Sequence, residues 1–411
     1  MSKVVIVGAG HGAGQVAATL MQKKYGGSIT MIGEERWYPY QRPPLSKKFL
    51  AGEMPAERLY FKPQSFYEGA VDIVLGNRVT EIDRDAQRVS TATGSDYDYD
   101  DLVLATGSRV RTLGVSGSDL AGVHYLRGID DVDGIRADMA PGRRIAIVGA
   151  GYIGLEVAAV SAKLGLDVTV IEMEDRVMNR VVSPELSAFY QDVHTANGVK
   201  LKLSTGVTGF SGSGRVDGVK TTSGETVPAN LVVIGIGILP NVELAEDCGL
   251  AVTNGIVVDD HCRTSDPHVY AIGDCTWHPN ALLGSGLRLE SVHNALEQAK
   301  TAALNICGED TAYAQVPWFW SDQYDLKLQI AGLSKGYDHT VTRGDPDGHS
   351  FSVLYLKDGA LIAVDAVNSP KDFLQAKPLI AEHAKIDPAM LANKDVQLKD
   401  MKIRCQNEVP K

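Results

Sequence analysis

Cysteine is scarce in this sequence, and its positions form no functional pattern. The 411 residues contain five cysteines, at Cys248, Cys262, Cys275, Cys307 and Cys405. No two of them have CxxC or CxxxxC spacing, so neither a redox dithiol nor a metal site is indicated. Their odd number also argues against a disulfide framework. We therefore expect buried or incidental thiols.

Long hydrophobic runs are absent as well. No apolar stretch approaches the roughly 20 residues that a membrane-spanning helix needs. After Met1, Ser2 and Lys3 the apolar run VVIV stops at Gly8, and no small-residue cleavage site follows a long apolar region. The sequence therefore predicts neither a membrane span nor a signal peptide, and we expect a cytoplasmic protein.

Positive charge is in deficit. The chain has 40 lysines and arginines against 51 aspartates and glutamates, which gives a formal net charge of −11. This charge disfavours nucleic acid and anionic membrane as partners. An acidic partner protein would need a local basic patch, and the sequence contains no long basic run to supply one.

An internal repeat is the most informative feature that is present. The segments VVIVGAGHGAGQVAATL (residues 4–20) and IAIVGAGYIGLEVAAVSAKLG (residues 145–165) share a short apolar strand, a glycine turn and a helical period. Each is followed by a second apolar strand that ends in an acid, Glu34 or Glu172. Two β-α-β units this far apart predict two dinucleotide sites in an α/β chain. The length of 411 residues fits two or three domains.

The first glycine turn has two of the three usual glycines. Gly8 permits the tight turn and Gly10 lets the backbone approach a pyrophosphate. Ala13 stands at the third position, which allows close packing of helix on strand. The pyrophosphate would bind at the N-terminus of the helix, and Glu34 would accept hydrogen bonds from an adenosine ribose.

The second glycine turn has the complete pattern, at Gly149, Gly151 and Gly154. Glu172 ends the next strand, where a carboxylate accepts from a ribose 2′-hydroxyl and repels a 2′-phosphate. This arrangement favours NADH over NADPH. Arg176 and Arg180 follow closely, and they either bind a phosphate or lie as solvated helix charges.

Two further segments suit a flavin. Gly273 and Asp274 end an apolar strand, so a ligand could lie against the glycine backbone while Asp274 accepts from ribityl hydroxyls. Downstream, a helical run begins near Val292, and the positive end of its dipole would stabilise a reduced flavin.

The segment YQRPPLSK carries two cations beside adjacent prolines. Pro43 and Pro44 predict an extended segment, with Ser46 capping a helix. Arg42 and Lys47 would then be held near a cofactor, or lie at the surface as ordinary cations.

From about Ser321 onward the pattern changes to strands such as KLQIAGL and FSVLYLKDGALIAV. The second of these turns at Asp358 and Gly359, which is a strong hairpin signal. A helical stretch, KDFLQAKPLIAEH, follows, so the end of the chain predicts a separate α+β domain. The glycine-rich residues 210–218 predict a surface β-turn.

Eight motifs are distributed along the chain: GAGH, PYQRPPLSK, ATGSR, GAGYIGLEVAA, GIGILPN, AIGD, RLESVHNALEQA and PWFWSDQYDLKLQIAGL. This combination resembles the NADH-dependent ferredoxin reductases that serve bacterial oxygenases, within the FAD-dependent pyridine nucleotide-disulfide oxidoreductases. Ala13 and Val110 depart from the usual pattern. The resemblance implies a glutathione-reductase-like α/β fold of two nested Rossmann-like domains and a C-terminal α+β domain. The implied boundaries are 1–113 with 245–320 for FAD, 114–244 for NAD and 321–411 for the C-terminal domain.

The same resemblance assigns roles to individual residues. Lys47 would lie close to the reactive flavin nitrogen, and Glu156 would pair with it near the nicotinamide carboxamide; these are the implied catalytic residues. The implied FAD ligands are Gly8, Gly10, His11, Ala13, Glu34, Arg42, Lys47, Val79, Ala105, Thr106, Gly107, Arg127, Asp274, Val292 and Trp320. The implied NAD ligands are Gly149, Gly151, Tyr152, Ile153, Gly154, Glu156, Glu172 and Gly237.

The resemblance also implies an activity, in which NADH reduces FAD and single electrons pass to a 2Fe-2S ferredoxin that supplies a cytochrome P-450 or Rieske oxygenase. Disulfide reductases need a dithiol and flavin peroxidases a cysteine within YQRPPLSKKFL, and this chain has neither. Two alternatives stay open: a reductase for rubredoxin or a small-molecule acceptor, and an NADH-sensing flavoprotein similar to apoptosis-inducing factor. Arg288 is our candidate docking residue, and we expect a monomer or weak dimer.

Overall fold

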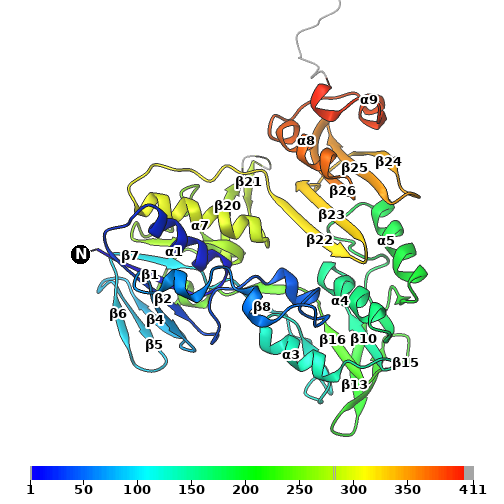
Figure 1. Ribbon diagram of the computed structural model, residues 1–411, viewed down its shortest axis with the longest axis horizontal. Coiled ribbons are helices and arrows are strands. Elements are labelled where there is room, and N and C mark those ends of the chain that lie inside the picture. The colour runs from blue at the N-terminus through cyan, green and yellow to red at the C-terminus, as the bar shows by residue number, and fades with distance from the viewer. Residues whose placement is uncertain (1, 281, 283, 402–411) are drawn as a thin grey trace, which may run out of the picture. The chain divides into compact units, whose positions relative to one another are not determined.

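The computed structural model describes residues 2–280, 282 and 284–401 (Figure 1). The chain forms two compact units, and it passes between them more than once. Unit 1 comprises Met1–Arg42, Ala56–Arg109 and Ile238–Gln315. Unit 2 comprises Pro43–Pro55, Val110–Gly237 and Val316–Lys411. The division into three domains drawn from the sequence stays a prediction.

Unit 1 is built around a five-stranded sheet in the order β19-β7-β1-β2-β3, and every neighbouring pair in it is parallel. The strands are β1 (Lys3–Val7), β2 (Ser28–Gly33), β3 (Asp72–Leu75), β7 (Asp101–Leu104) and β19 (Val269–Ala271). Because all five run the same way, their carboxyl ends meet at one edge, where ligands bind in open α/β sheets.

Alternating side chains of β1 build two cores on the two faces of this sheet. Val4 and Ile6 pack against α1 (His11–Gln22) and α7 (Val292–Ile306), which lie side by side in Figure 1. Val5 and Val7 belong to the opposite core, together with residues of β4, β5 and α6. These elements are β4 (Val79–Asp83), β5 (Arg88–Thr91), its neighbour β6 (Asp96–Asp98) and α6 (Glu243–Asp247). The apolar run that the sequence marked as a strand is therefore buried on both faces.

Unit 2 repeats this plan, as the internal repeat predicts. Its parallel sheet has the order β12-β11-β10-β16-β9. The strands are β9 (Val123–Tyr125), β10 (Arg144–Val148), β11 (Asp167–Ile171), β12 (Lys200–Lys202) and β16 (Leu231–Ile234). Helices α3 (Ile129–Asp138) and α4 (Tyr152–Lys163) contact these strands. Residues of β13 (Val207–Gly212), β14 (Val216–Thr221) and β15 (Thr226–Pro228) share a core with the sheet.

The last part of unit 2 is an antiparallel sheet in the order β22-β23-β26-β25-β24, with α8 (Pro370–Ala381) packed on it. The strands are β22 (Trp318–Gln323), β23 (Leu326–Gly332), β24 (His339–Asp345), β25 (Ser350–Lys357) and β26 (Ala360–Val367). The predicted hairpin is confirmed, because Asp358 and Gly359 join β25 to β26 with φ of 51° and 76°. Two successive left-handed residues make the turn that suits the twist of a hairpin.

The predicted surface turn is confirmed at residues 213–215, which connect β13 to β14, while the rest of the predicted range 210–218 belongs to these two strands. The predicted extended segment at Pro43-Pro44 is wrong, because Pro43–Ser46 forms the 3-10 helix η1 and Ser46 lies inside it. A proline φ near −65° fits a tight helical turn as well as an extended chain, and the missing N–H is not needed at a helix start.

The remaining helices and strands complete the described part of the chain. They are η2 (Ala56–Leu59), α2 (Gln64–Tyr67), β8 (Ser108–Val110), α5 (Pro184–Ala196), β17 (Ile238–Pro240), β18 (Ile256–Val257), η3 (Gly273–Cys275), β20 (Thr276–Asn280), β21 (Ser285–Leu287), α9 (Pro388–Ala392) and η4 (Leu398–Asp400). Within the described residues, no helix is both long and apolar enough to cross a membrane. Cys248, Cys262, Cys275 and Cys307 are free thiols, and Cys405 lies outside the described residues.

Candidate functional site

The first glycine turn connects β1 to α1 at the carboxyl edge of the unit 1 sheet. Gly8 has a φ of +117°, and a Cβ built on it would lie 2.3 Å from the carbonyl oxygen of Ala105, so only glycine fits. Gly10 precedes the first residue of α1, and a Cβ there would meet no protein atom within 4 Å. This space at a helix N-terminus suits the pyrophosphate of a dinucleotide.

The second glycine turn has the same geometry between β10 and α4. A Cβ on Gly149 (φ +102°) would lie 2.4 Å from the carbonyl oxygen of Gly235, and a Cβ on Gly151 would meet nothing within 4 Å. At Gly154 a Cβ would lie 2.1 Å from the carbonyl oxygen of Gly149, so the third glycine is required here. Both units therefore present a backbone cradle of the shape that a pyrophosphate needs.

The third position differs between the two turns without a change in how the helices begin. Ala13 is fully buried where Gly154 stands in the repeat. The amide of Gly14 donates to the carbonyl of Gly10 at 3.0 Å, and the amide of Leu155 donates to Gly151 at the same distance. The first helix thus accommodates the extra methyl group and keeps its N-terminal register.

The acids that end the second strands have different neighbours. Glu34 follows β2 and is largely exposed, with Arg78 at 3.7 Å. Glu172 follows β11, and its Oε2 accepts from the backbone amide of Ala150, inside the second glycine turn, at 2.6 Å. Its Oε1 accepts from the amide of Glu174 at 3.0 Å. Glu172 therefore holds the second glycine turn in place, and its role as a ribose ligand stays a prediction.

Arg176 is not available to bind a coenzyme phosphate. Its guanidinium donates to the carbonyls of Val182 and Asn179 at 2.9 and 2.8 Å, and to the hydroxyl of Ser187 at 2.6 Å. These bonds use Arg176 to hold the loop between β11 and α5 in place. Arg180 is exposed and is the remaining cation in this segment.

The Gly273-Asp274 pair lies at the carboxyl end of β19, beside the start of α7. Gly273 has a φ of +80°, and its amide donates to Oε1 of Gln298 at 2.7 Å. The Asp274 carboxylate accepts from the hydroxyl of Ser108 at 2.7 Å. Among the residues that the structure describes, Oδ1 of Asn294 and Nε2 of Gln298 are buried without a hydrogen-bond partner. Unsatisfied buried polar atoms on the first turns of α7 fit a site that a bound molecule completes.

Arg42 is anchored in unit 1 by its own neighbours. Its guanidinium donates to Oε1 of Glu35 at 2.5 Å and to the hydroxyl of Tyr40 at 2.9 Å. Tyr40 in turn donates to Oε2 of Glu35 at 2.6 Å. A cation held by two partners has a fixed position, which a binding role requires.

Lys47 and Glu156, the two predicted catalytic residues, are brought together in unit 2. The ammonium of Lys47 lies 2.7 Å from Oε2 of Glu156, on the second turn of α4. The hydroxyl of Ser46 donates to the same oxygen at 2.5 Å, and that of Ser321 donates to Oε1 at 2.6 Å. Burial raises the pKa of Glu156, while Lys47 and the two hydroxyls act in the opposite direction.

Ser108, Ser321 and Asn241 were not singled out from the sequence, and Ser46 was predicted only as a helix cap. Ser46, Ser108 and Ser321 adjoin the predicted residues Lys47, Gly107 and Trp320, and this adjacency is the signal that could have found them. Asn241 bonds the predicted ATGSR segment: it accepts from the Thr106 hydroxyl through its carbonyl at 2.7 Å and donates to the Thr106 carbonyl through its side chain at 2.9 Å.

The remaining predicted site residues are divided between the units. In unit 1 they are His11, at the first position of α1, Val79, at the start of β4, Ala105, Gly107 and Val292, at the first position of α7. In unit 2 they are Arg127, Tyr152, Ile153, Gly237 and Trp320. The ring of Tyr152 lies 4.7 Å from that of Phe319, next to Trp320 on β22. Their ligand roles stay predictions.

Arg288, the candidate docking residue, offers little surface. Its side chain is 12% exposed, and its guanidinium lies 2.5 Å from Oε1 of Glu290. Nε of Arg288 is buried without a partner among the described residues. The docking role stays a prediction, and only a small part of this side chain is accessible to a partner.

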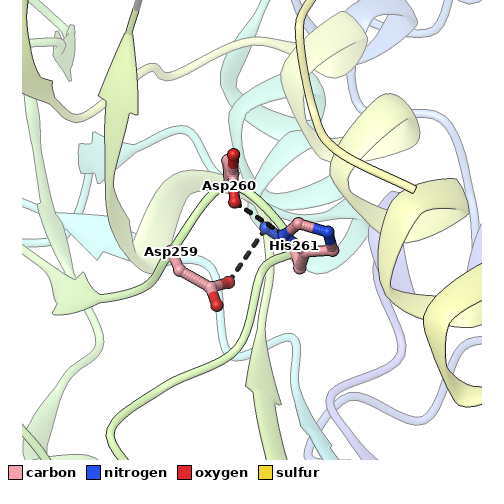
Figure 2. A group of neighbouring side chains, drawn as sticks. All are labelled: Asp259, Asp260 and His261. Carbon is pink, nitrogen blue, oxygen red and sulfur yellow. Dashed lines mark hydrogen bonds and ion pairs between the residues drawn. The ribbon is translucent and has the colours of Figure 1, made fainter. Parts of the chain in front are cut away.

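A separate cluster of charged side chains occupies one exposed turn of unit 1, shown in Figure 2. Nδ1 of His261 lies 2.6 Å from Asp260, and Nε2 lies 2.8 Å from Asp310. Asp259 accepts from the backbone amide of His261 at 2.9 Å. An imidazole with a carboxylate at each nitrogen donates from both, which requires the protonated form. We therefore interpret the cluster as an ion-pair clamp.

Comparison with known proteins matches two parts of the chain to known families. Residues 2–299 match a family described as pyridine nucleotide-disulphide oxidoreductase, and residues 318–402 match one described as reductase C-terminal. The chain is 43% identical over 398 residues to rhodocoxin reductase of Rhodococcus erythropolis, covering 96% of this chain and 93% of that protein. It is 41% identical over 370 residues to a rubredoxin-NAD(+) reductase of Pseudomonas putida, covering 90% and 96%. The crystal structure of the covalent putidaredoxin reductase–putidaredoxin complex superimposes with a TM-score of 0.94 at 41% identity, over 97% of each chain.

Replacement of Glu172 by alanine should weaken NADH binding by about tenfold, the size expected for loss of a charge-assisted hydrogen bond. Selectivity for NADH over NADPH should fall with it, because the repulsion of a 2′-phosphate is removed. Titration of the protein with each nucleotide measures both effects. The matched control is Asp175→Ala, at an exposed acid in the following loop. An unchanged preference would mean that Glu172 only holds the glycine turn.

Thermal unfolding of a His261→Asn variant should reveal the ion-pair clamp through its pH dependence. Hydrogen bonding to Asp260 raises the pKa of His261, against the effect of burial. The clamp therefore stabilises fully below the unfolded-state pKa of about 6.5 and is lost as the pH rises through the folded-state value. The difference from wild type should be within about 1 kcal/mol at pH 5.5 and should shrink as the pH rises.

The control for this experiment is His339→Asn, at an exposed position on β24. A wild-type advantage that grows with rising pH would contradict the clamp.

Proposed function

Because the chain belongs to the pyridine nucleotide-disulphide oxidoreductase family, we propose that it is an NADH-dependent ferredoxin reductase. FAD and a nicotinamide nucleotide are its cofactors, the flavin accepting a hydride from NADH and releasing electrons singly to a 2Fe-2S ferredoxin. The observation that carries this function is the match over 97% of the chain to a reductase captured covalently with its putidaredoxin partner.

The two glycine cradles divide the nucleotides between the units. The cradle at Gly10 and the carboxylates of Glu34 and Asp274 would hold FAD in unit 1. The cradle at Gly151 and the Glu172 carboxylate would hold NADH in unit 2. What supports this division is Asp274, which follows β19 in the same sheet as β1 and whose carboxylate accepts from the hydroxyl of Ser108.

Cysteine chemistry has no place in this proposal. Cys275 adjoins Asp274, but its thiol is buried and contacts the backbone carbonyl of Ile272 at 3.2 Å. Burial raises the pKa of Cys275, so the thiol stays protonated and is a poor nucleophile. Without a dithiol in the sequence, electrons must leave the flavin directly.

Lys47 and Glu156 have a positioning and electrostatic role in the proposed function. A buried carboxylate is retained as an anion only with close compensation, which the Lys47 ammonium supplies at 2.7 Å. We infer that Glu156 accepts a hydrogen bond from the nicotinamide carboxamide and so orients the ring. No residue of this chain needs to act as a nucleophile or general base.

Substitution of Lys47 by methionine should slow the reduction of bound FAD by NADH on the order of 10²-fold, because misplacement of a reacting ring has effects of that size. Anaerobic stopped-flow absorbance measures the rate. Lys48→Met is the matched control, since Lys48 is the exposed neighbour. A Glu156→Gln variant also lacks the ion pair but keeps Lys47, so comparison of its rate with that of Lys47→Met separates loss of the ion pair from loss of the lysine itself. Equal rates in Lys47→Met and Lys48→Met would contradict the role of Lys47.

The acceptor is tested by mixing NADH-reduced protein with a 2Fe-2S ferredoxin from its own host, with rubredoxin, and with ferricyanide. Ferredoxin should be reduced with the highest kcat/KM. Preference for rubredoxin would favour the second candidate function, which the similarity to a rubredoxin-NAD(+) reductase supports. Slow flavin reduction with a long-lived charge-transfer complex would instead indicate an NADH-sensing protein.

We further propose that the ferredoxin supplies a cytochrome P-450 or a Rieske oxygenase, and that the protein acts in the cytoplasm as a monomer or weak dimer. The free thiols Cys248 and Cys307 are only partly buried, which suits a reducing compartment. Cell fractionation and light scattering test location and oligomeric state.

A further inference from the structure

A chain of hydrogen bonds runs through unit 2 from Glu156 to Tyr324, in the turn that follows β22. Oε1 of Glu156 is bonded to the hydroxyl of Ser321 at 2.6 Å, and Nε2 of Gln323 lies 3.2 Å from that hydroxyl. Oε1 of Gln323 lies 2.8 Å from Nε2 of His194, on α5. Nδ1 of His194 lies 3.2 Å from the hydroxyl of Tyr324. Three separate segments of sequence therefore meet in one connected network.

The chemistry of each group fixes the direction of the chain. Gln323 uses its amide nitrogen toward Ser321, so its oxygen faces His194 and can only accept. Nε2 of His194 must then carry the proton, which leaves Nδ1 to accept from the Tyr324 hydroxyl. Ser321 receives the Gln323 amide and so turns its own proton to Glu156. Every donor in the chain points toward the carboxylate.

Burial makes this alignment consequential. Ser321 and His194 are 0% exposed and Gln323 is 1% exposed, so the three central groups are shielded from water. Aligned hydrogen bonds polarise one another, and in a low dielectric their effect on an anion is larger than in water. Burial also lowers the pKa of His194, which agrees with the neutral imidazole that the chain requires.

The two carboxylate oxygens of Glu156 thus have separate partners. Oε2 is held by Lys47 and Ser46, while Ser321 is the only one of the described residues that donates to Oε1. Removal of the Ser321 hydroxyl would leave Oε1 buried without a donor and free the carboxylate to rotate about its terminal bond. The orientation of the Glu156 carboxylate therefore depends on the Ser321 hydroxyl as well as on Lys47 and Ser46.

We propose that Ser321, Gln323 and His194 are positioning residues that hold Glu156 in the orientation needed for hydride transfer from NADH. The proposal rests on the proposed function of the Lys47–Glu156 pair. None of the three needs to contact either nucleotide. Their contribution is a directional hydrogen-bond chain whose polarity is set by the tautomer of His194.

The tautomer is tested in the FAD-bound protein, independently of activity. Ring-¹⁵N histidine labelling and long-range ¹⁵N–¹H correlation spectra at neutral pH distinguish the two neutral tautomers and the imidazolium. A His194→Gln variant assigns the resonance. The Nε2-protonated neutral form is the expected result. An Nδ1-protonated or doubly protonated ring would overturn the proposed direction of the chain.

The kinetic consequence is tested with two pairs of variants in anaerobic stopped flow. Ser321→Ala should lower the limiting rate of FAD reduction by about tenfold, with the dissociation constant for NADH changed less than about twofold, because orientation is lost and not contact. Ser321→Thr keeps the hydroxyl and should restore most of the rate. Ser213→Ala, at an exposed turn, is the matched control.

His194 gives a second pair should the threonine not fit its buried site. His194→Met breaks the chain and should slow reduction several-fold, while His194→Gln can donate and accept in the same order and should keep the rate. A wild-type limiting rate in both Ser321→Ala and His194→Met would overturn the proposal. If the wild-type protein itself were not reduced by NADH, the proposed function would fail instead, and the spectra would still decide the chain.

Discussion

Close passage of one backbone over another is the constraint on which both nucleotide cradles depend. At Gly8 and at Gly149 the turn after the first strand runs so near the end of a neighbouring strand that a single methyl group would overlap a carbonyl oxygen. That proximity places Gly10 and Gly151 at the edge of the sheet with open space beside them. The helices that follow then present their N-terminal amides to the same space. The two parallel sheets and the helices packed on them hold both glycine turns in this position, and the acids Glu34 and Glu172 follow neighbouring strands of the same sheets.

A buried carboxylate is the costly element of the site. Transfer of an ion into a protein interior costs on the order of several kcal/mol, and this cost is offset only by close partners. Glu156 has three of them, from η1, β22 and its own ion pair with Lys47. Stability alone would not retain the Lys47–Glu156 ion pair, because two well-packed apolar residues of similar volume are often at least as stable. A carboxylate whose two oxygens are both held by donors has a fixed orientation, which is what a positioning role requires.

Local signals in the sequence predicted much of this structure. The glycine turns, the hairpin at Asp358 and Gly359 and the turn at Gly273 after β19 all depend on backbone conformations that few residues adopt. The extended segment predicted from Pro43 and Pro44 was wrong, because the φ angle of proline suits both an extended chain and the 3-10 helix at Pro43–Ser46.

Long-range contacts were beyond such reasoning. The Ser321–Glu156 bond joins residues 165 positions apart, and the His194–Gln323 bond joins residues 129 apart. No spacing rule links them. The limited exposure of Arg288 likewise follows from tertiary packing and not from its neighbours in sequence.

The bond between Glu172 and the amide of Ala150 has a consequence for how this protein can change. In the proposed function, one carboxylate selects the coenzyme and also fastens the glycine turn through the Ala150 amide, so the two properties share a single side chain. A substitution that admits the phosphorylated coenzyme also removes an acceptor from a buried amide. Evolution or engineering toward NADPH would therefore need a second substitution that again supplies an acceptor for the Ala150 amide. A change of coenzyme in this protein would then require two substitutions together.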